Sequence, residues 1–332
     1  MFSFIIPVKN DGKRLQHCLT SISACRPTAE YEVIVVDNGS TDDSATVGRG
    51  AGARVLPIAQ GRVSALRNAA AAAARGEWLA FVDADHELGQ SWIGAASDLT
   101  RTADIGAAGA LYLPPADGTW VQNLYGALRG RTIGRGDTRW LGSGNLLVRR
   151  EAFEAVGGFD PNLESCEDVD LCQRLRDAGW RLVGDERLVS IHHGDPNTLA
   201  RLFHAERWRG RDNLRVTFRT RLRARDLPSI IAPIVIALAV PASVLAAVLA
   251  PVTHGRSIGV GVASASLVVA LIMVRTVKIA TAGRVWQPVS LTRALAVAAT
   301  YELARAAALV TRAAHHRETS VSNPSSSGAP AR

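Results

Sequence analysis

Residues 78–85 are Trp78-Leu79-Ala80-Phe81-Val82-Asp83-Ala84-Asp85. The first five are apolar and fit a buried strand, and two carboxylates follow directly at its carboxyl end. Two acids one residue apart at a strand end can share a divalent cation, which takes oxygen ligands and keeps coordination sites for a substrate's phosphates. Acids in this position also serve as ordinary turn or helix-capping residues, so the rest of the chain must decide between the two interpretations.

The surrounding sequence alternates between strand and helix patterns. The predicted strands are residues 3–8, 32–36, 54–57, 78–82, 145–148 and 188–191, and the predicted helices include residues 63–75 and 168–178. Alternation of this kind predicts an α/β fold with a Rossmann-like, mostly parallel central sheet covered by helices on both faces.

Polar residues follow three of these strands at their carboxyl ends. They are Lys9-Asn10-Asp11, Asp37-Asn38 and Asp83-Ala84-Asp85. Ligands of open parallel sheets bind beyond the carboxyl ends of the strands, so we expect the three clusters to line one crevice.

The C-terminal part of the 332-residue chain is strongly apolar. Residues 227–253 contain no charged side chain and would form a helix about 40 Å long, against a hydrocarbon core of about 30 Å. A second uncharged stretch covers residues 257–274. The pair predicts a transmembrane helical hairpin over residues 227–275, and a buried hairpin of a soluble protein is the alternative.

The net charge of +8 is concentrated beside this hairpin. Arginines crowd the juxtamembrane segment 201–226, and basic residues also follow the second stretch. The positive-inside rule then places both ends of the hairpin, and the N-terminal domain, on the cytoplasmic face of the cell membrane. A basic collar of this kind binds anionic membrane lipids. No nucleic-acid-binding motif accompanies the charge, so we expect no nucleic-acid partner.

The remaining segments are assigned by their composition. Arg293, Glu302, Arg305 and Arg312 interrupt an apolar stretch, so we expect residues 276–316 to form an amphipathic interfacial helix rather than a third span. A tail rich in Ser and Pro, residues 317–332, should be disordered. The four cysteines lack Cys-x-x-Cys spacing and are expected to be reduced.

Residues 1–200 resemble the family 2 glycosyltransferases, which are inverting enzymes with the GT-A fold. The matching pieces occur in the family's order: Phe4-Ile5-Ile6-Pro7-Val8-Lys9-Asn10, Val35-Val36-Asp37-Asn38-Gly39-Ser40-Thr41-Asp42, Ala65-Leu66-Arg67-Asn68, Gly76-Glu77-Trp78, Asp83-Ala84-Asp85, Gly142-Ser143-Gly144-Asn145, Val156-Gly157-Gly158-Phe159-Asp160 and Glu167-Asp168-Val169-Asp170-Leu171. The ordered set carries the resemblance, since each piece alone is loose.

The resemblance implies a role for each matching position. On the donor side it assigns Pro7, Val8, Asn10, Asp37, Arg67 and Asp83, with Asp37 accepting from a base N–H and Arg67 near the diphosphate. Asp85, supported by Asp83, would hold Mg²⁺ or Mn²⁺ against the diphosphate. Asp168 would be the general base that deprotonates the acceptor hydroxyl. A cation on the leaving diphosphate and a carboxylate on the opposite side of the sugar also make chemical sense without the family.

Several of these positions have a second interpretation. Glu167 and Asp168 begin a helix and can serve as its caps, although the helix dipole also favours an ionised, base-competent Asp168. His192 resembles the additional metal ligand of some GT-A enzymes, with a solvent-exposed histidine as the alternative. On the acceptor side stand Gly144, Glu167, Arg207 and Trp208. The last two belong to His204-Ala205-Glu206-Arg207-Trp208, which is similar to the Gln-x-x-Arg-Trp motif of processive members, or forms an arginine-rich helix on the membrane.

We therefore expect a metal-dependent enzyme that moves a sugar from a nucleotide-diphosphate-sugar donor to a lipid-linked or membrane-proximal hydroxyl in glycolipid or cell-envelope glycan synthesis. A sugar-nucleotidyltransferase is the first alternative, but it requires a Gly-rich, Arg-containing loop where this chain has Pro7-Val8-Lys9-Asn10. A non-catalytic membrane scaffold is the second, and it predicts the loss of an acid that this chain retains. Protein partners are left unassigned.

Overall fold

The computed structural model describes residues 1–25, 29–219 and 227–321. The chain divides into two compact units. The first comprises Met1–Thr198 with Ile279–Gln287, and the second comprises Leu199–Lys278 with Pro288–Arg332. Residues 220–226 of the predicted basic segment, and most of the predicted disordered tail, lie outside the described residues.

The first unit is built on an eight-stranded sheet of order β3-β2-β1-β4-β8-β6-β9-β7. The strands are β1 (Phe2–Val8), β2 (Tyr31–Asp37), β3 (Arg54–Pro57), β4 (Trp78–Val82), β6 (Ile105–Gly109), β7 (Arg135–Asp137), β8 (Asn145–Arg149) and β9 (Arg181–Asp185). β8 runs antiparallel to β4 and β6, and β7 runs antiparallel to β9, while the other neighbours pair in parallel. The mostly parallel sheet predicted from the sequence is confirmed.

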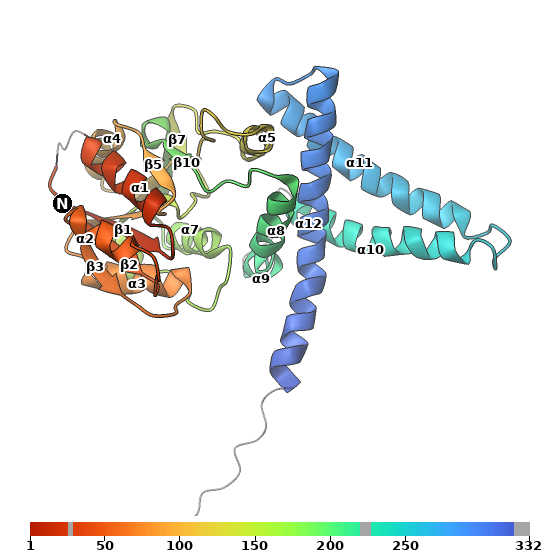
Figure 1. Ribbon diagram of the computed structural model, residues 1–332, viewed down its shortest axis with the longest axis horizontal. Helices are drawn as coiled ribbons and strands as arrows, with labels where there is room; N and C mark the ends of the chain where they lie inside the picture. The colour runs from red at the N-terminus through yellow and green to blue at the C-terminus, as the bar shows by residue number, and fades with distance from the viewer. Residues whose placement is uncertain (26–28, 220–226, 322–332) are drawn as a thin grey trace, which may run out of the picture. The chain divides into compact units, whose positions relative to one another are not determined.

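Helices cover both faces of this sheet (Figure 1). They are α1 (Gly12–Ala24), α2 (Ser44–Gly50), α3 (Val63–Ala73), α4 (Trp92–Thr100), α6 (Arg150–Ala155) and α7 (Glu167–Asp177), while α5 (Trp120–Arg129) contributes no residue to the two core clusters. One core cluster joins the sheet to α1 and α4, and a second joins it to α3, α6 and α7. This sandwich of helices, sheet and helices is the arrangement that strands buried on both faces require.

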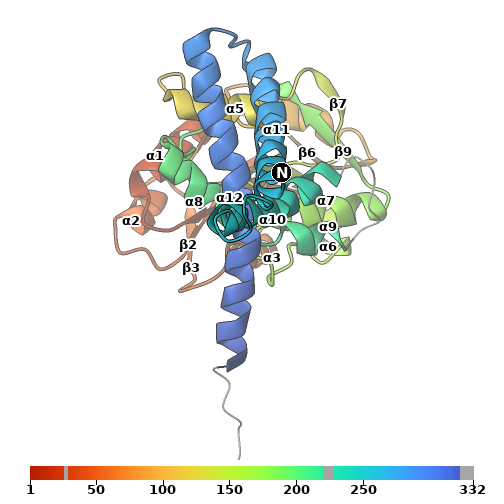
Figure 2. The same ribbon diagram turned by 90° about the vertical axis from the view of Figure 1, so that its right-hand side faces the viewer.

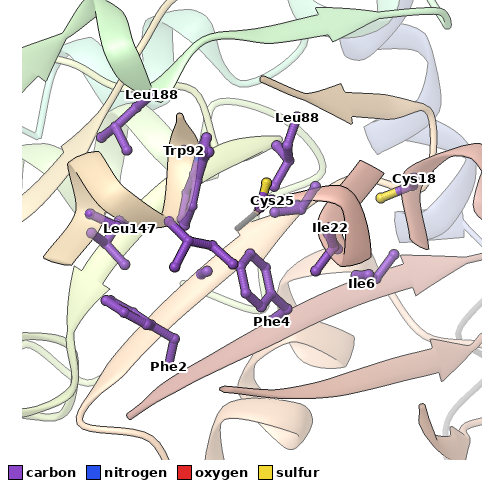
Figure 3. Packing of buried hydrophobic residues seen from close by; sticks show 14 of the residues in the cluster. Phe2, Phe4, Ile6, Cys18, Ile22, Cys25, Leu88, Trp92, Leu147 and Leu188 are labelled. Carbon is purple, nitrogen blue, oxygen red and sulfur yellow. The ribbon is translucent and has the colours of Figure 1, made fainter. Parts of the chain in front are cut away.

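Strand β1 shows how the sequence produces the two cores. Its side chains alternate between faces, so Phe4 and Ile6 pack in the first cluster while Ile5 packs in the second. Figure 3 shows Phe4 near Trp92 of α4 and Ile22 of α1, and the Phe4 and Trp92 ring centroids lie 5.4 Å apart. Apolar side chains on both faces are therefore needed at the centre of the sheet. The polar residue of β1, Ser3, is buried and donates to Glu32 Oε1 at 2.7 Å.

The carboxyl ends of β1, β2 and β4 meet at one edge, as predicted. Asn10, after β1, adopts a left-handed conformation with φ of 52°, and its Oδ1 accepts the Thr41 N–H at 2.7 Å. Because β8 runs in the opposite direction, its amino end reaches the same edge, where the Asp83 N–H donates to the Gly144 carbonyl at 3.1 Å. Reversal of one strand thus brings residues 142–145 beside the acidic pair.

A two-stranded antiparallel ribbon completes this edge. It consists of β5 (His86–Leu88) and β10 (Ser190–His192), and His86 pairs directly with His192. The strand predicted over residues 188–191 begins later than expected, because Glu186–Leu188 form a 3-10 helix, η1. The four cysteines are free, as expected.

The second unit is helical. It contains α8 (Leu199–Arg209), α9 (Asn213–Thr217), α10 (Leu227–Leu249), most of α11 (Ile258–Gly283) and α12 (Pro288–Val321). α10 and α11 are joined by a short turn, as in the predicted hairpin (Figure 1). α12 packs against α8 and α10, and it crosses α10 rather than running alongside it (Figures 1 and 2).

Three helices are long and apolar enough to cross a membrane: Leu227–Leu249, Ile258–Gly283 and Pro288–Thr311. The predicted hairpin accounts for the first two of these helices. The third also has the length and composition of a span, and the interfacial placement of residues 276–316 stays a prediction. One of the charges that interrupt this stretch, Glu302 of α12, is buried and accepts a hydrogen bond from Arg275 Nε at 2.7 Å. The helix also continues to Val321, beyond the start of the predicted disordered tail.

Leu147 of β8 offers a test of the first core, since it is fully buried (Figure 3). Replacement of Leu147 by Ala should lower the free energy of unfolding by about 2–5 kcal/mol, because it leaves a cavity beneath the sheet. Ile133→Ala, at a position 78% exposed, should change it by less than about 0.5 kcal/mol. Urea unfolding of the detergent-solubilised chain, followed by tryptophan fluorescence, measures both. Equal effects would contradict the assigned core.

Candidate active site

A buried arginine joins the two acidic motifs of the sequence. Arg67 of α3 is 2% exposed, and it donates to Asp83 Oδ1 at 2.6 Å and to Glu167 Oε1 at 2.8 Å. Although burial opposes its charge, the two carboxylates raise the pKa of Arg67 above its ordinary value. Ser143 Oγ also donates to Glu167, at 2.9 Å. The guanidinium predicted to lie near a diphosphate is therefore engaged with protein carboxylates.

Asp168 lies next to this bridge, in the first turn of α7. Its Oδ1 accepts the Val169 N–H at 2.8 Å, and the Trp140 side chain also hydrogen-bonds to it. Burial, followed by the negative charge of Glu167, raises the pKa of Asp168 to about 7. This shift runs opposite to the direction in which the dipole of α7 would act on the carboxyl. A carboxyl with this pKa can exchange a proton near neutral pH.

Neither Glu167 nor Asp168 is the N-cap residue of α7, although Asp168 Oδ1 accepts the Val169 N–H of its first turn. The residue that precedes α7 is Cys166, in a left-handed conformation with φ of 60°, and its side chain makes no capping hydrogen bond. Asp170, on the same turn, forms an ion pair with Arg174 at 2.7 Å, which gives it a structural role within the helix. Glu167 and Asp168 thus face the site rather than the helix end alone.

Asp85 lies close to a hydrogen-bonded chain of charged groups. His192 Nε2 is 3.3 Å from Asp85 Oδ2, and His192 Nδ1 is 2.7 Å from Asp195 Oδ1. Asp195 in turn forms a two-point ion pair with Arg129 of α5. Burial opposes the charge of His192, but its bonds to Asp195 and Asp85 raise its pKa to about 9. Burial also opposes ionisation of Asp85, but the hydrogen bond from His192 lowers its pKa.

The position of His192 excludes the alternative of a solvent-exposed side chain, since His192 is 8% exposed. The outward position belongs to His193, whose Nε2 lies 2.8 Å from Glu87 Oε2. The ring of His192 stacks on His86, with centroids 4.5 Å apart and an angle of 25° between the planes. Tyr112 lies edge-on to His86 at 4.5 Å, and its hydroxyl accepts the Gly144 N–H at 3.2 Å.

Asp85, His86 and His192 together form a set of possible metal ligands, because one ligand atom of each lies within 4.8 Å of the others. The residues fit a cation in two ways. His86 Nε2 is buried and has no hydrogen-bond partner among the described residues, and a β-carbon at Gly194 would overlap the Asp85 carboxylate. When bound, a divalent cation would supply positive charge to neutralise a departing diphosphate.

The remaining donor-side residues surround the ends of β1 and β2. Asp37 is nearly buried, and its Oδ1 accepts the Ser40 N–H at 3.1 Å. Asn10 bonds the loop after β2, as described above. The Val8 side chain packs in the first core cluster, and its carbonyl accepts the Asn38 N–H, so Val8 shapes this region through the backbone. Pro7 is partly buried within β1.

The predicted acceptor-side residues belong to different units. Gly144 and Glu167 lie in the first unit, beside Asp83 and Arg67 respectively. Arg207 and Trp208 lie on α8 of the second unit, and Trp208 is 44% exposed. Their assignment remains a hypothesis from the motif.

Sequence reasoning did not assign functions to His86, Tyr112, Arg129 and Asp195. His86 directly follows the Asp-x-Asp triplet, and Asp195 follows His192 at a spacing of three, so both carried a local signal. Tyr112 and Arg129 had none, because the irregular segment after β6 shows no periodicity that would place them.

Two family models match the chain. The model of glycosyl transferase family 2 matches residues 3–157, and that of glycosyl transferase family 21 matches residues 123–316, which is more than half of the chain. The chain is 28% identical over 211 residues to glycosyltransferase AglE of Haloferax volcanii, covering 58% of this chain and 67% of that protein. It is 31% identical over 226 residues to the N-acetylglucosaminyl-diphospho-decaprenol L-rhamnosyltransferase of Mycobacterium tuberculosis, covering 55% of this chain and 72% of that protein.

Other curated relatives are much longer, and the chain spans 24% and 17% of two of them. The fold is similar to that of mannosyltransferase PcManGT from Pyrobaculum calidifontis, solved in complex with GDP-Man and Mn²⁺. That match has a TM-score of 0.60 and 15% sequence identity, and it covers 94% of this chain and 86% of the other. The ordered motifs, the GT-A sheet and these matches agree, and the chain belongs to the family 2 glycosyltransferases.

Proposed function

We propose that the chain transfers a sugar, with inversion at the anomeric carbon, from a nucleotide diphosphate donor to a hydroxyl of a lipid-linked acceptor at the cytoplasmic face of the membrane. The observation that carries the proposal is the Arg67 bridge. In this bridge, one buried guanidinium donates to both Asp83 and Glu167. Asp83 lies next to the possible cation ligands, and Glu167 lies next to Asp168. Donor-side and acceptor-side groups thus belong to a single hydrogen-bonded assembly.

Each group has a distinct task in this reaction. Asp37, Asn10 and the backbone at Pro7 and Val8 would hold the nucleoside, and Asp85 with His192 would ligate the divalent cation. Asp168 Oδ would accept the proton of the acceptor hydroxyl as its oxygen bonds to the anomeric carbon and the diphosphate leaves with the bonding electron pair. General base catalysis of this kind contributes about 10²–10⁴ in rate.

The donor class is supported by the chemistry of the site and by the solved PcManGT complex, which holds GDP-Man and Mn²⁺. A diphosphate leaving group carries several negative charges, so a cluster able to ligate a cation at the sheet edge suits it. We assign catalysis to residues 1–200 and membrane attachment to the helices of residues 227–316, with anionic lipids bound by the basic segment 201–226. The charge distribution favours the cytoplasmic side.

The acceptor class is supported by the helices of the second unit. The described part of this unit contains a cavity of about 190 Å³, lined by Pro228, Ser229, Pro233, Arg275, Tyr301, Glu302 and Arg305. Arg275 lies over the Tyr301 ring at 4.7 Å, and Arg305 lies 3.9 Å from Glu206 of α8. Charged groups among otherwise apolar helices usually mark a polar ligand site. The acceptor of the similar rhamnosyltransferase is a diphospho-decaprenol lipid, which has such a polar group on an apolar chain.

Asp168→Asn should reduce kcat by about 10²–10⁴ while the donor still binds, because the amide cannot accept the hydroxyl proton. In the wild-type protein, kcat/KM should fall as the pH drops below about 7, since protonation of Asp168 removes the base. Nucleotide release from purified protein in membranes, measured against pH, checks both. Asp177→Asn, on the exposed end of α7, is the matched control. Full activity of Asp168→Asn would contradict the assignment.

Arg67→Lys should lower kcat/KM by about 10- to 100-fold, because one ammonium cannot hold Asp83 and Glu167 in the geometry of the planar guanidinium. Arg62→Lys is the control, since Arg62 is half-exposed and lies 3.7 Å from Glu164. Circular dichroism verifies that both variants are folded. If Arg67→Lys retains the wild-type kcat/KM, the bridge does not position the site.

The double variant Arg275→Gln/Glu302→Gln removes two opposite charges together, so no buried charge is left without its partner. It should raise KM for a polyprenyl-diphosphate-linked acceptor by about tenfold, equivalent to 1.4 kcal/mol, and leave donor binding unchanged. Arg256→Gln, in the exposed turn between α10 and α11, is the control. An unchanged KM for the acceptor would show that this cavity does not bind it.

A further inference from the structure

We propose that His86 is a third protein ligand of the cation, together with Asp85 and His192, and that this two-histidine, one-carboxylate site binds Mn²⁺ in preference to Mg²⁺. The inference rests on the proposed function in one respect, which is that the cation neutralises the diphosphate of the sugar donor. It replaces the two-carboxylate site that the Asp83-Ala84-Asp85 triplet suggested.

Backbone pairing places the two histidines together. His86 and His192 are partners across the β5–β10 ribbon, and their rings stack on one side of it. Asp85 directly precedes His86 and contacts His192 Nε2 at 3.3 Å. One ligand atom from each of the three lies within 4.8 Å of the others. The ribbon therefore brings two imidazoles and a carboxylate close enough for one ion to reach an atom of each.

His86 has one satisfied nitrogen and one unsatisfied nitrogen. Its Nδ1 lies 2.9 Å from Ser190 Oγ, whereas its Nε2 is buried and has no hydrogen-bond partner among the described residues. The residue as a whole is 1% exposed. A buried polar atom without a partner is costly, so a native protein that keeps one usually reserves it for a ligand.

The space beside these atoms is kept free by glycines. A β-carbon at Gly144 would lie 2.8 Å from His86 Nε2, and one at Gly194 would lie 3.0 Å from His192 Nε2. Neither glycine has a positive φ, so backbone conformation does not require glycine at these positions. The β-carbons would also crowd Asp83 Oδ2 and Asp85 Oδ2, so the two glycines leave space beside the carboxylates and the imidazole nitrogens together.

The outer partners orient one histidine as a ligand. Asp195 bonds to His192 Nδ1 and is itself held by Arg129, an arrangement that directs Nε2 toward Asp85. Asp83 is differently placed, because its Oδ1 is engaged with Arg67 at 2.6 Å. This oxygen belongs to the bridge, and Asp83 is not part of the cluster of possible ligands.

This donor set determines the metal preference. Mg²⁺ favours an octahedron of oxygen atoms, whereas imidazole suits transition metal ions. A site with two imidazoles and one carboxylate, with places left for diphosphate oxygens and water, therefore favours Mn²⁺. Without a role in ligation, His86 would be a packed core histidine, and its removal would not affect the metal.

His86→Asn tests the inference, because asparagine can keep a hydrogen bond to Ser190 while it lacks Nε2. In full-length protein in detergent, with MnCl₂ or MgCl₂ as the only added ligand, calorimetry should show that the wild type binds Mn²⁺ at least about tenfold more tightly than Mg²⁺. His86→Asn should weaken Mn²⁺ binding by about 10- to 100-fold and reduce that preference. His193→Asn, at the adjacent outward-facing histidine, should behave as the wild type.

Electron spin echo spectroscopy of bound Mn²⁺ supplies a readout that a structural role would not change. The wild type should show couplings to two imidazole nitrogens, and His86→Asn should show one. If His86→Asn unfolds, His86→Gln with the same measurements takes its place. Wild-type affinity and two nitrogen couplings in the variant would overturn the proposal. Metal binding needs no sugar donor, so a chain that binds Mn²⁺ through His86 but transfers no sugar would refute the proposed function alone.

Discussion

The site depends on one buried guanidinium. Arg67 donates to Asp83 at the end of β4 and to Glu167 at the start of α7, two residues that are far apart in the sequence. A charge this deeply buried is stable only when it is paired and hydrogen-bonded, so the two carboxylates are held as firmly as the arginine. The first turn of α7 provides one of the two anions that pair with Arg67.

Much of the fold was predictable because its first half follows simple periodicities. β4 is apolar throughout, and β1 and β2 each contain a run of at least four apolar residues. Pattern alone therefore located the three strands within a residue or two. The later strands were harder to predict. β6 reads Ile105-Gly106-Ala107-Ala108-Gly109, which has little of the β-branched and aromatic character of strands, and its strand state comes from pairing with β8 and β9.

The residues of the candidate site likewise fall into those that the sequence pattern located and those that it did not. Asp37, Asp83, Asp85 and Asp168 were found because they stand at the ends of regular elements, within ordered motifs. The contribution of Arg67 as a bridge was not predictable, since it depends on a distance between α3 and α7 that no local pattern encodes. The surroundings of the charges in the third long helix were unpredictable for a related reason. The sequence alone does not show that Glu302 is buried against Arg275.

The pairing of β5 with β10 also has a consequence for biosynthesis. Asp85 and His86 leave the ribosome about a hundred residues before His192 and its partner Asp195, and a three-residue strand such as β5 has little stability of its own. Contacts of such large sequence separation form late in folding. A nascent chain therefore carries Asp85 and His86 without their later partners while most of its first unit is synthesised. His192 and Asp195 follow only shortly before the apolar helices begin to emerge.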